Sequence, residues 1–525
     1  MNYARRHKMN PHGSRILTIA VLLLALAPLA AVQSTACPPQ PLRLVLGNCS
    51  NVPAAWGAEL GIGEGRDAPK LCFMPSTVVN ATLLMARDLC DGEDQAEGAD
   101  HNYTLSREQC LSRRGGALRR DSLSRFAIEL DAGARDNLRG SNPGWWKLMS
   151  EQGLEPFPSA VRVPLRFGHV VTSAFDQVWV MQGKLHSMNH LGLAADSNLL
   201  GSLAESKLIS PGSGWGLDVG SRSVTQPRDG SLVLGGYDSN AFQGNLVPFP
   251  IPKSGGGPVA NRICHLQVSM KKLAVNISVN GTQQEPLLYE DPTTTTGVCI
   301  EPYDDFFRLG KKKTQEIVNR AGIRLIHRPE KHPDLFNPEE GLVYDKSLNL
   351  SITLDITLDK GFTVTIPSSE LVRPLTALNR ADGKLVTHPD YNEIAIFRSD
   401  PLDDSAVFGR AFLSQQVYLV VDPANREFLF GRLKQRPDVA PVLTTTVACP
   451  APPKLSKAEI GLVAVGIVLG VQTLALLWLG IRKIRRKRGA SRTAEGGGGD
   501  GVTPNGRILT PPDPPPAPYN LTNAE

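Results

Sequence analysis

"GSLVLGGYDSNAFQGNLVPFPI", residues 230–251, is the most informative stretch for the fold. It belongs to a long region of short apolar runs separated by Gly, Asp and Asn, which indicates strands joined by turns. The whole chain shows the same balance, since Gly (49) and Pro (41) are plentiful and aromatic residues make up 6%. Period-2 alternation is clear at residues 349–358 and 362–367, whereas helical periodicity is clearest at 313–321. The 525-residue chain is therefore predicted to be mainly β, with room for two or more domains.

Three segments, in the same order along the chain, resemble the pepsin-like aspartic protease family. The first begins "LGLAADSNLL" (residues 191–221), and the second is Leu234-Gly235-Gly236-Tyr237-Asp238 with the residues that follow it to 251. The third, "AVFGRAFLSQQVYLVVDPANREFLFGR" (residues 406–432), is similar to the family's final motif. The match covers roughly residues 56–433.

The resemblance implies an all-β, bilobal pepsin-like fold with a few short helices and a cleft between two similar lobes. The lobes are expected at residues 56–250 and 251–435, after an N-terminal strip at 37–55. Fungi encode many surface-anchored relatives of this family, so the resemblance implies a fungal-type member with a peptide or wall-component ligand at the cleft.

Catalysis in that family needs one Asp-Thr/Ser-Gly loop from each lobe, because two adjacent carboxyl groups share a proton and activate water. When the strand "WGAELGIG" is aligned without gaps to the corresponding strand of the family, Met74-Pro75-Ser76 falls at the first loop. The second loop position holds Glu301-Pro302-Tyr303. Met74 and Glu301 thus stand where the two Asp residues belong, and no catalytic residue is assigned.

Other acidic residues are expected to be structural. Asp304 and Asp305 follow Glu301 closely, and solvation of their loop is favoured over a rebuilt catalytic pair. Asp131 begins "DAGARDN", which resembles the family's Asp-Thr/Ser-Gly tripeptide, but its position in the first lobe favours a polar turn.

These features favour a pseudoprotease that binds, senses or scaffolds. An atypical active aspartic endopeptidase, using Glu301 or Asp304 with an unplaced carboxylate, is the alternative, and a structural wall glycoprotein is a third. The cysteine spacing shows no CxxC or Cys/His pattern, and the chain has no HExxH, Gly-x-Ser-x-Gly or P-loop motif. No metal, cofactor or nucleic acid is therefore expected.

The two ends predict a type I membrane protein at the plasma membrane or cell surface. Residues 1–36 have the pattern of a secretory signal, with an uncleaved anchor as the alternative. Residues 460–481 carry no charge and are long enough for a transmembrane helix, and "RKIRRKR" (482–488) predicts a cytosolic tail. A Thr/Pro-rich stalk is expected at 436–459. The tail, 482–525, is expected to be disordered, with a Pro run that either serves as a spacer or docks an SH3- or WW-type partner.

An extracellular location predicts disulfides and N-glycosylation. Cys264 is expected to pair with Cys299, and Cys90 with Cys110, whereas Cys37, Cys49 and Cys449 are left unassigned. For Cys72, a buried thiol and a bridge to the N-terminal strip both remain open. The glycosylation sequons on the outer side begin at Asn48, Asn80, Asn102, Asn276, Asn280 and Asn349.

Overall fold

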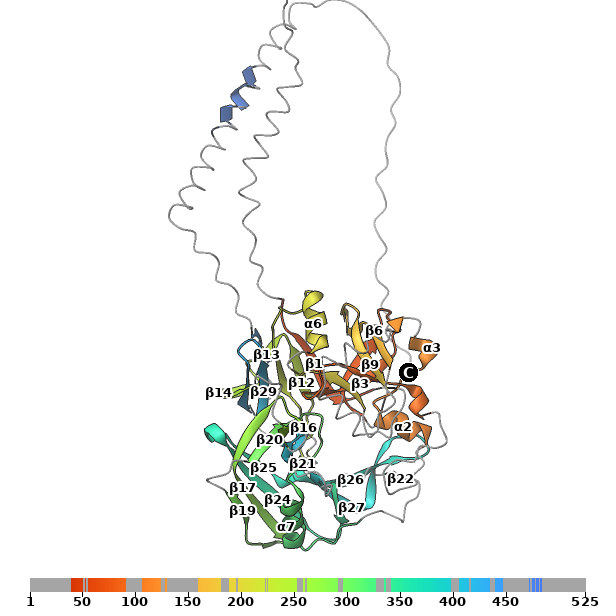
Figure 1. Cartoon of the computed structure of the whole chain (residues 1–525), viewed down its shortest axis with the longest axis vertical. Helices are drawn as coiled ribbons and strands as arrows, with labels where there is room; N and C mark the ends of the chain where they lie inside the picture. The colour runs from red at the N-terminus through yellow and green to blue at the C-terminus, as the bar shows by residue number, and fades with distance from the viewer. Residues whose placement is uncertain are drawn as a thin grey trace, which may run out of the picture. The chain divides into compact units, whose positions relative to one another are not determined.

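The structure is a computed structural model of the chain, and it describes most of residues 39–446. The described residues are 39–50, 52, 55–90, 106–123, 128–129, 159–180, 188–194, 197–221, 223, 225–252, 258–259, 262–290, 296–326, 335–336, 341–397, 406–414, 417–434, 440–446, 472, 475–476, 478–480 and 482–483. The chain divides into two compact units, Cys37–Cys449 and a second unit made of Met1–Ala36 and Pro450–Glu525. The unit Cys37–Cys449 is mainly β, as predicted (Figure 1).

The larger of two main sheets contains 15 strands among the described residues. Their order is β14 (Phe242–Pro250), β30 (Glu427–Leu433), β29 (Val417–Asp422), β11 (Trp215–Asp218), β12 (Gly230–Leu234), β1 (Leu42–Asn48), β2 (Trp56–Ile62), β3 (Lys70–Ser76), β10 (Asn189–Gly192), β4 (Leu83–Met85), β9 (Phe175–Val180), β6 (Ser159–Val163) and β5 (Ile128–Glu129). In addition, β7 (Leu165–Phe167) pairs with β2, and β8 (Val170–Val171) pairs with β7. Strands from both sides of residue 250 share this sheet. It therefore joins the beginning and the end of the predicted protease-like region.

The second sheet has 12 strands within the described ranges. Its order is β22 (Leu335–Phe336), β26 (Val372–Asn379), β27 (Leu385–Phe397), β21 (Phe307–Arg308), β28 (Ala406–Phe408), β20 (Thr296–Ile300), β17 (Gln267–Val279), β24 (Leu350–Leu358) and β25 (Thr363–Ile366), with β18 (Thr282–Gln283) and β19 (Leu287–Glu290) on β17 and β23 (Gly341–Asp345) on β27. β24 buries every second residue, as its alternating sequence predicts.

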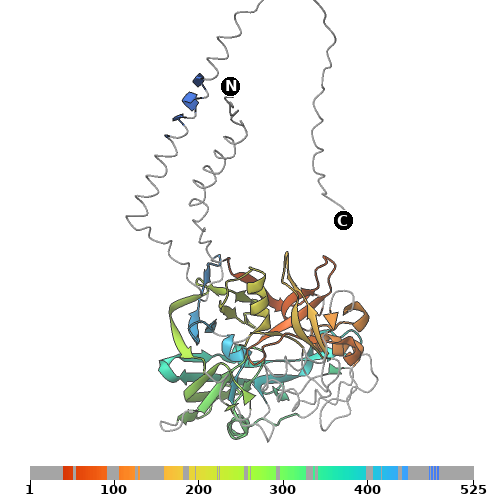
Figure 2. The ribbon, with the colours of Figure 1, turned by 45° about the horizontal axis from the view of Figure 1, so that its top comes forward.

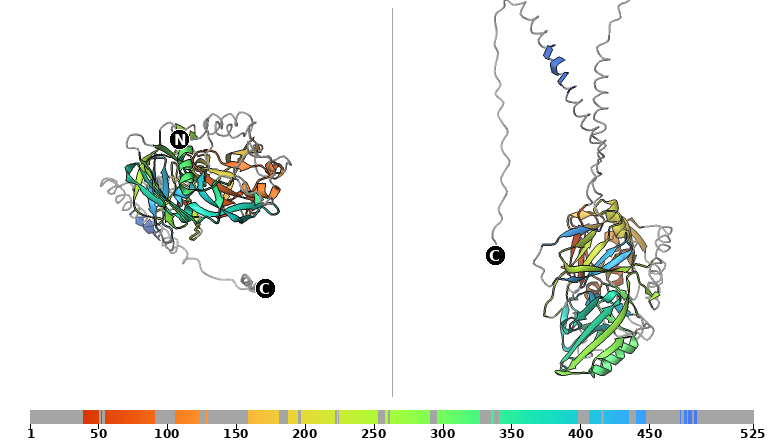
Figure 3. Two further views of the ribbon diagram at one scale, coloured as in Figure 1. Left: turned by 90° about the horizontal axis from the view of Figure 1, so that it is seen from below. Right: turned by 90° about the vertical axis from the view of Figure 1, so that its left-hand side faces the viewer.

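Short helices lie at the margins of these sheets. They are η1 (Arg87–Cys90), α2 (Arg107–Arg113), α3 (Arg120–Leu123), α6 (Asn198–Glu205), α7 (Lys311–Ala321), η2 (Asp359–Gly361), α8 (Ser368–Leu371) and α9 (Arg410–Leu413). α7 matches the predicted helix closely and ends at Gly322, which adopts the left-handed conformation that favours glycine. Figure 3 shows it lying along strands of the second sheet.

A parallel pair with a similar local arrangement occurs in each sheet. β3 pairs in parallel with β10, so that Ser76 lies beside Gly192. β20 pairs in parallel with β28, so that Ile300 lies beside Phe408. Each of the two pairs brings a strand next to one much later in the sequence, and a loop leaves β3 and β20 at the equivalent end.

Both ends of this unit are tied to its sheets. The N-terminal strip contributes β1, which pairs with both β12 and β2. Part of the predicted stalk also packs on the domain, because β31 (Leu443–Thr445) pairs with β13 (Gly236–Asp238). Figure 2 shows blue strands from late in this unit beside yellow-green strands from the middle of the chain. The extended stalk expected from residue 436 therefore needs correction at 440–446. A further two-stranded pair joins β15 (Pro258–Val259) and β16 (Arg262–Ile263).

The predicted signal at 1–36 lies outside the described residues, and so does most of the predicted span at 460–481. The few described residues between 472 and 483 are helical. Within the described part of the chain, no helix combines the length and apolar character that a membrane span requires.

Gly409, between β28 and α9, packs closely against the backbone of Asp304, and a substitution at Gly409 tests this contact. A Cβ atom there would overlap the backbone carbonyl of Asp304. We expect Gly409→Ala to lower the free energy of unfolding by about 3 kcal/mol, because close-packed backbone cannot move aside. Gly201→Ala, in α6 with open space around it, is the matched control and should raise it by up to about 1 kcal/mol. Urea unfolding of the full-length chain measures both, and equal effects would contradict the packing.

Candidate functional site

The two sheets meet through a hydrogen-bonded contact between Thr77 and Glu301, which are 224 residues apart. The Thr77 backbone N–H donates to Glu301 Oε2 at 3.0 Å and lies 3.3 Å from Oε1. Its hydroxyl oxygen lies 2.8 Å from Oε2 and 2.9 Å from the carbonyl oxygen of Ile300. Thr77 directly follows β3 and Glu301 directly follows β20, so the two parallel strand pairs position this contact.

The residues that lie against Glu301 begin two positions after Met74. Ser76 and Thr77, rather than Met74, lie against Glu301. Met74 is a buried member of the hydrophobic core and pairs with His190 on β10. Glu301 directly follows β20, the strand that pairs with β28.

Burial raises the pKa of Glu301 from 4.5 to about 7, although hydrogen bonds from Thr77, Tyr303 and Ser76 oppose the rise. The contact geometry suits the protonated acid. A single Thr77 hydroxyl proton can serve Glu301 or Ile300 but not both at once. If the Glu301 carboxyl group is protonated, it donates to the Thr77 hydroxyl oxygen, which then donates to Ile300.

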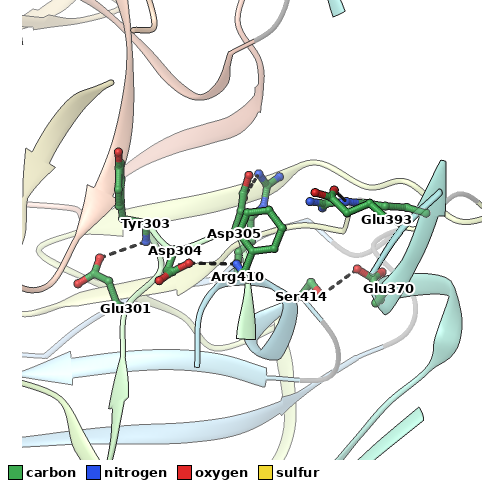
Figure 4. A network of polar contacts seen from close by, with 10 residues as sticks. Glu301, Tyr303, Asp304, Asp305, Glu370, Glu393, Arg410 and Ser414 are labelled. Atoms are coloured by element: carbon green, nitrogen blue, oxygen red, sulfur yellow. Dashed lines mark hydrogen bonds and ion pairs between the residues drawn. The ribbon is translucent and has the colours of Figure 1, made fainter. Parts of the chain in front are cut away.

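The neighbouring acids are paired with arginines. Asp304 is buried, forms an ion pair with Arg308, and its backbone oxygen accepts from the Arg410 N–H at 2.6 Å. Asp305 lies 3.4 Å from the Arg410 guanidinium. The prediction of a solvated loop is therefore wrong for Asp304. Figure 4 shows Glu301, Asp304, Asp305 and Arg410 gathered in this region.

Two further contacts join the sheets near this loop. The Arg410 guanidinium lies 3.2 Å from the ring centroid of Trp56, the first residue of β2. Glu370 in α8 is buried and accepts hydrogen bonds from Ser414, at 2.9 Å, and from Ser221. These acids therefore serve as hydrogen-bond acceptors and ion-pair partners between structural elements.

An aromatic contact lies beside the Thr77–Glu301 contact. The Tyr303 backbone N–H donates to Glu301 Oε1 at 3.1 Å. Its ring centroid lies 3.9 Å from that of His190 on β10. Burial lowers the pKa of His190 to about 3, so its imidazole is neutral at ordinary pH.

Aspartic-protease chemistry would need a second carboxyl group beside Glu301, and metal-dependent chemistry would need a cluster of metal ligands. The hydrogen-bond partners of the Glu301 carboxyl group among them are hydroxyl and backbone N–H groups, and none is a second carboxyl group. No cluster of three or more His, Cys, Asp or Glu side chains in the described ranges could hold a metal ion. Asp131 lies outside the described residues.

The disulfides agree with the predicted pairs and resolve one open alternative. Cys90–Cys110 and Cys264–Cys299 are both bonded, and Cys72 bridges to Cys49 in the N-terminal strip. Val78, in the loop after Thr77, packs against the Cys264–Cys299 bridge. Cys37 and Cys449 lie outside the described residues.

The sequons differ in accessibility. Asn48, Asn280 and Asn349 are exposed, whereas Asn102 lies outside the described residues. Asn80 is buried, so the structure argues against a glycan on it. Asn276 is half-buried, and its side-chain amide donates to Asp355 at 2.9 Å.

Sequence reasoning missed Thr77 and His190. A shift of two residues would have placed Ser76-Thr77 at the Asp-Thr positions, but it needs an insertion after the "GIG" strand that the ungapped placement excluded. No pattern marks His190, which lies just before the matched "LGLA" segment.

No protein-family model matches this chain, and no curated protein shows significant similarity to it.

The Thr77 hydroxyl can be tested by a pair of substitutions. Thr77→Val keeps the shape but removes a buried donor, and we expect it to lower the free energy of unfolding by about 2–3 kcal/mol. Thr77→Ser keeps the hydroxyl and should cost about 1 kcal/mol or less through the lost methyl group. Urea unfolding of full-length variants distinguishes them, and a tolerated valine would show that the contact is unimportant.

Glu301 also predicts a pH dependence of stability. The folded chain holds this proton up to about pH 7, whereas the unfolded chain releases it near 4.5. The Glu301 contribution to stability is therefore complete below about pH 4.5 and is lost as pH rises to about 7, a change of about 3 kcal/mol. Glu301→Gln cannot titrate and should lack this component. Unfolding of both chains at acidic and neutral pH measures it, and parallel pH profiles would refute the assignment.

Proposed function

We propose that this chain is a membrane-anchored cell-surface protein with a bilobal, pepsin-like extracellular domain that binds a peptide or wall-component ligand without cleaving it. It would face the outside, with one membrane helix and a cytosolic tail. The tail's Pro run would suit a cytosolic partner.

Two observations support the pepsin-like part of the proposal. The parallel pairs β3–β10 and β20–β28 repeat one local arrangement in the two sheets. This is the relation expected of two similar lobes that each contribute one loop. The Thr77 hydroxyl also contacts the backbone of the opposite loop at Ile300, as a Thr or Ser hydroxyl does when it locks the two loops together in that family.

The surroundings of Glu301 are the main support for the proposal that the chain does not cleave its ligand. An aspartic mechanism needs two carboxyl groups within hydrogen-bond reach, one to activate water and one to donate to the scissile carbonyl. Ser76 and Thr77 lie opposite Glu301 instead, and Thr77 is hydrogen-bonded to the Glu301 carboxyl group. Among the residues that the structure describes, Glu301 therefore has no second acid with which to share a proton.

Exposed sequons and disulfides support the extracellular location. Three bridges join described cysteines, and disulfides persist in oxidising compartments. Asn48, Asn280 and Asn349 present their side chains at the surface, where a glycan could be attached.

A peptide-library cleavage assay at acidic and neutral pH tests the proposal. We expect the purified full-length chain to cut no peptide above the rate of Glu301→Gln, which serves as the matched control. Cleavage that is blocked by a statine-type inhibitor and abolished by Glu301→Gln would establish the alternative, an atypical active aspartic endopeptidase.

A further inference from the structure

The β26–β27 hairpin of the second sheet reaches α2, a helix that is attached to the first sheet (Figure 1). The side-chain amide of Gln109 in α2 donates to the backbone carbonyl of Leu378 in β26 at 2.7 Å. Leu378 is 6% exposed and packs against the Cys90–Cys110 disulfide. The hairpin therefore makes a contact between the two sheets that is separate from the contact of Thr77 with Glu301.

The turn of this hairpin is shaped to lie against α2. Gly383 has a positive φ of 65°, and a Cβ atom there would overlap the backbone carbonyl of Glu108 in α2. The turn also satisfies its own backbone. The Gly383 N–H donates to the Asn379 carbonyl at 2.9 Å, and the Asp382 carboxylate accepts from the Lys384 N–H at 3.1 Å. It can therefore keep its shape when it is not in contact with α2.

The helix α2 is likewise held without the hairpin. Ser106 and Gln109 form a reciprocal capping box at its first turn. The Cys90–Cys110 disulfide ties it to η1. The Asn189 side chain on β10 donates to the carbonyl of Arg114, directly after the helix, at 2.9 Å. Two self-sufficient elements are thus joined by one hydrogen bond and one small apolar contact.

The hairpin is divided by an irregularity in its ladder. Pro374 pairs with Asn392 and Thr376 pairs with Thr387, so residues 388–391 of β27 lie opposite Leu375 alone. Such irregularities bend a strand pair locally. We call residues 376–387, on the α2 side of this break, the strap. In the described part of the chain, the strap pairs with no strand outside the hairpin except β22.

The other half of the hairpin is fixed close to the Glu301 loop. It pairs with β23 along residues 391–397 of β27. Arg373 forms an ion pair with Glu393 at 3.0 Å, and its guanidinium lies 5.4 Å from the ring centroid of Phe306. The hairpin therefore runs from the loop that carries Glu301 to α2, with its flexible point between these two ends.

We propose that the strap is a movable closure, which swings off α2 about the irregular ladder beside Leu375 while α2 and the rest of the hairpin keep their places. Because the fixed half adjoins the Glu301 loop, the position of the strap decides how large a ligand can approach that loop from the side of α2. This consequence rests on the proposed binding function, whereas the release of the strap does not.

Limited digestion of the full-length chain with trypsin tests the release. The turn contains Arg380 and Lys384, which are both exposed, and its backbone lies against α2 at Gly383. Gln109→Glu keeps the acceptor of the capping box but places a carboxylate, which is ionised at about pH 8, against the Leu378 carbonyl. We expect this variant to be cut at Arg380 or Lys384 about tenfold faster than the wild type, because cleavage follows the population of the open form.

Matched controls separate release of the strap from other effects. Glu108→Gln changes an exposed side chain of α2 and should leave the rate within about twofold of the wild type. Gly383→Asn tolerates the positive φ but overlaps α2, so it should accelerate the same cuts from the hairpin side. Gly281→Asn, at another positive φ with open space around it, should not.

Equal cutting at Arg380 and Lys384 in the wild type, Gln109→Glu and Gly383→Asn would overturn the inference. An acceleration of the same size at Lys70 in β3 would also overturn it, because the whole unit would then be opening. Gln109→Glu and Gly383→Asn lie on opposite sides of the contact, so each tests the strap if the other does not fold. The digestion involves no ligand, and its outcome is therefore separate from the test of the proposed function.

Discussion

A buried acid that reaches across two sheets is the constraint on which the rest of this structure depends. Glu301 is one methylene longer than aspartate, and its carboxyl group meets the backbone N–H and hydroxyl of Thr77. Burial of a carboxylate is expensive unless it is protonated or well supplied with donors. Protonation near neutral pH and the donors on Thr77 and Tyr303 meet that requirement together. The acid consequently acts as a structural connection between the sheets.

Alternating patterns predicted the mainly β character of the chain and a few of its strands, and helical periodicity predicted one helix. β24, β25 and α7 fall where the periodicity placed them, because local patterns record which face of each element is buried. Two disulfide pairs also followed from how the cysteines bracket their segments. The docking of β31 on β13 was missed, because backbone pairing at residues 443–445 leaves little trace in a Thr-rich sequence.

The site was predictable only in part. Glu301 was predicted to lie between a strand and a helix, and it follows β20 and precedes α7. The residue opposite Glu301 was expected at Met74, whereas Ser76 and Thr77 lie there, because this place depends on the length of the turn between β2 and β3. Asp304 was expected in solvent, yet it is buried beside Arg308, a partner that only the folded loop brings within reach. Contacts such as Tyr303 with His190 join residues from different sheets and have no local signature.

The central claim is that Glu301 faces Thr77 and that no second carboxyl group among the described residues is hydrogen-bonded to it. An experimental structure of the full-length chain tests this most directly, through the distances from the Glu301 carboxyl oxygens to their neighbours. The account predicts the Thr77 N–H and hydroxyl within hydrogen-bond distance of Glu301, with Ser76 beside them. A second carboxyl group within hydrogen-bond distance of Glu301 would contradict it and would restore the machinery of an aspartic protease.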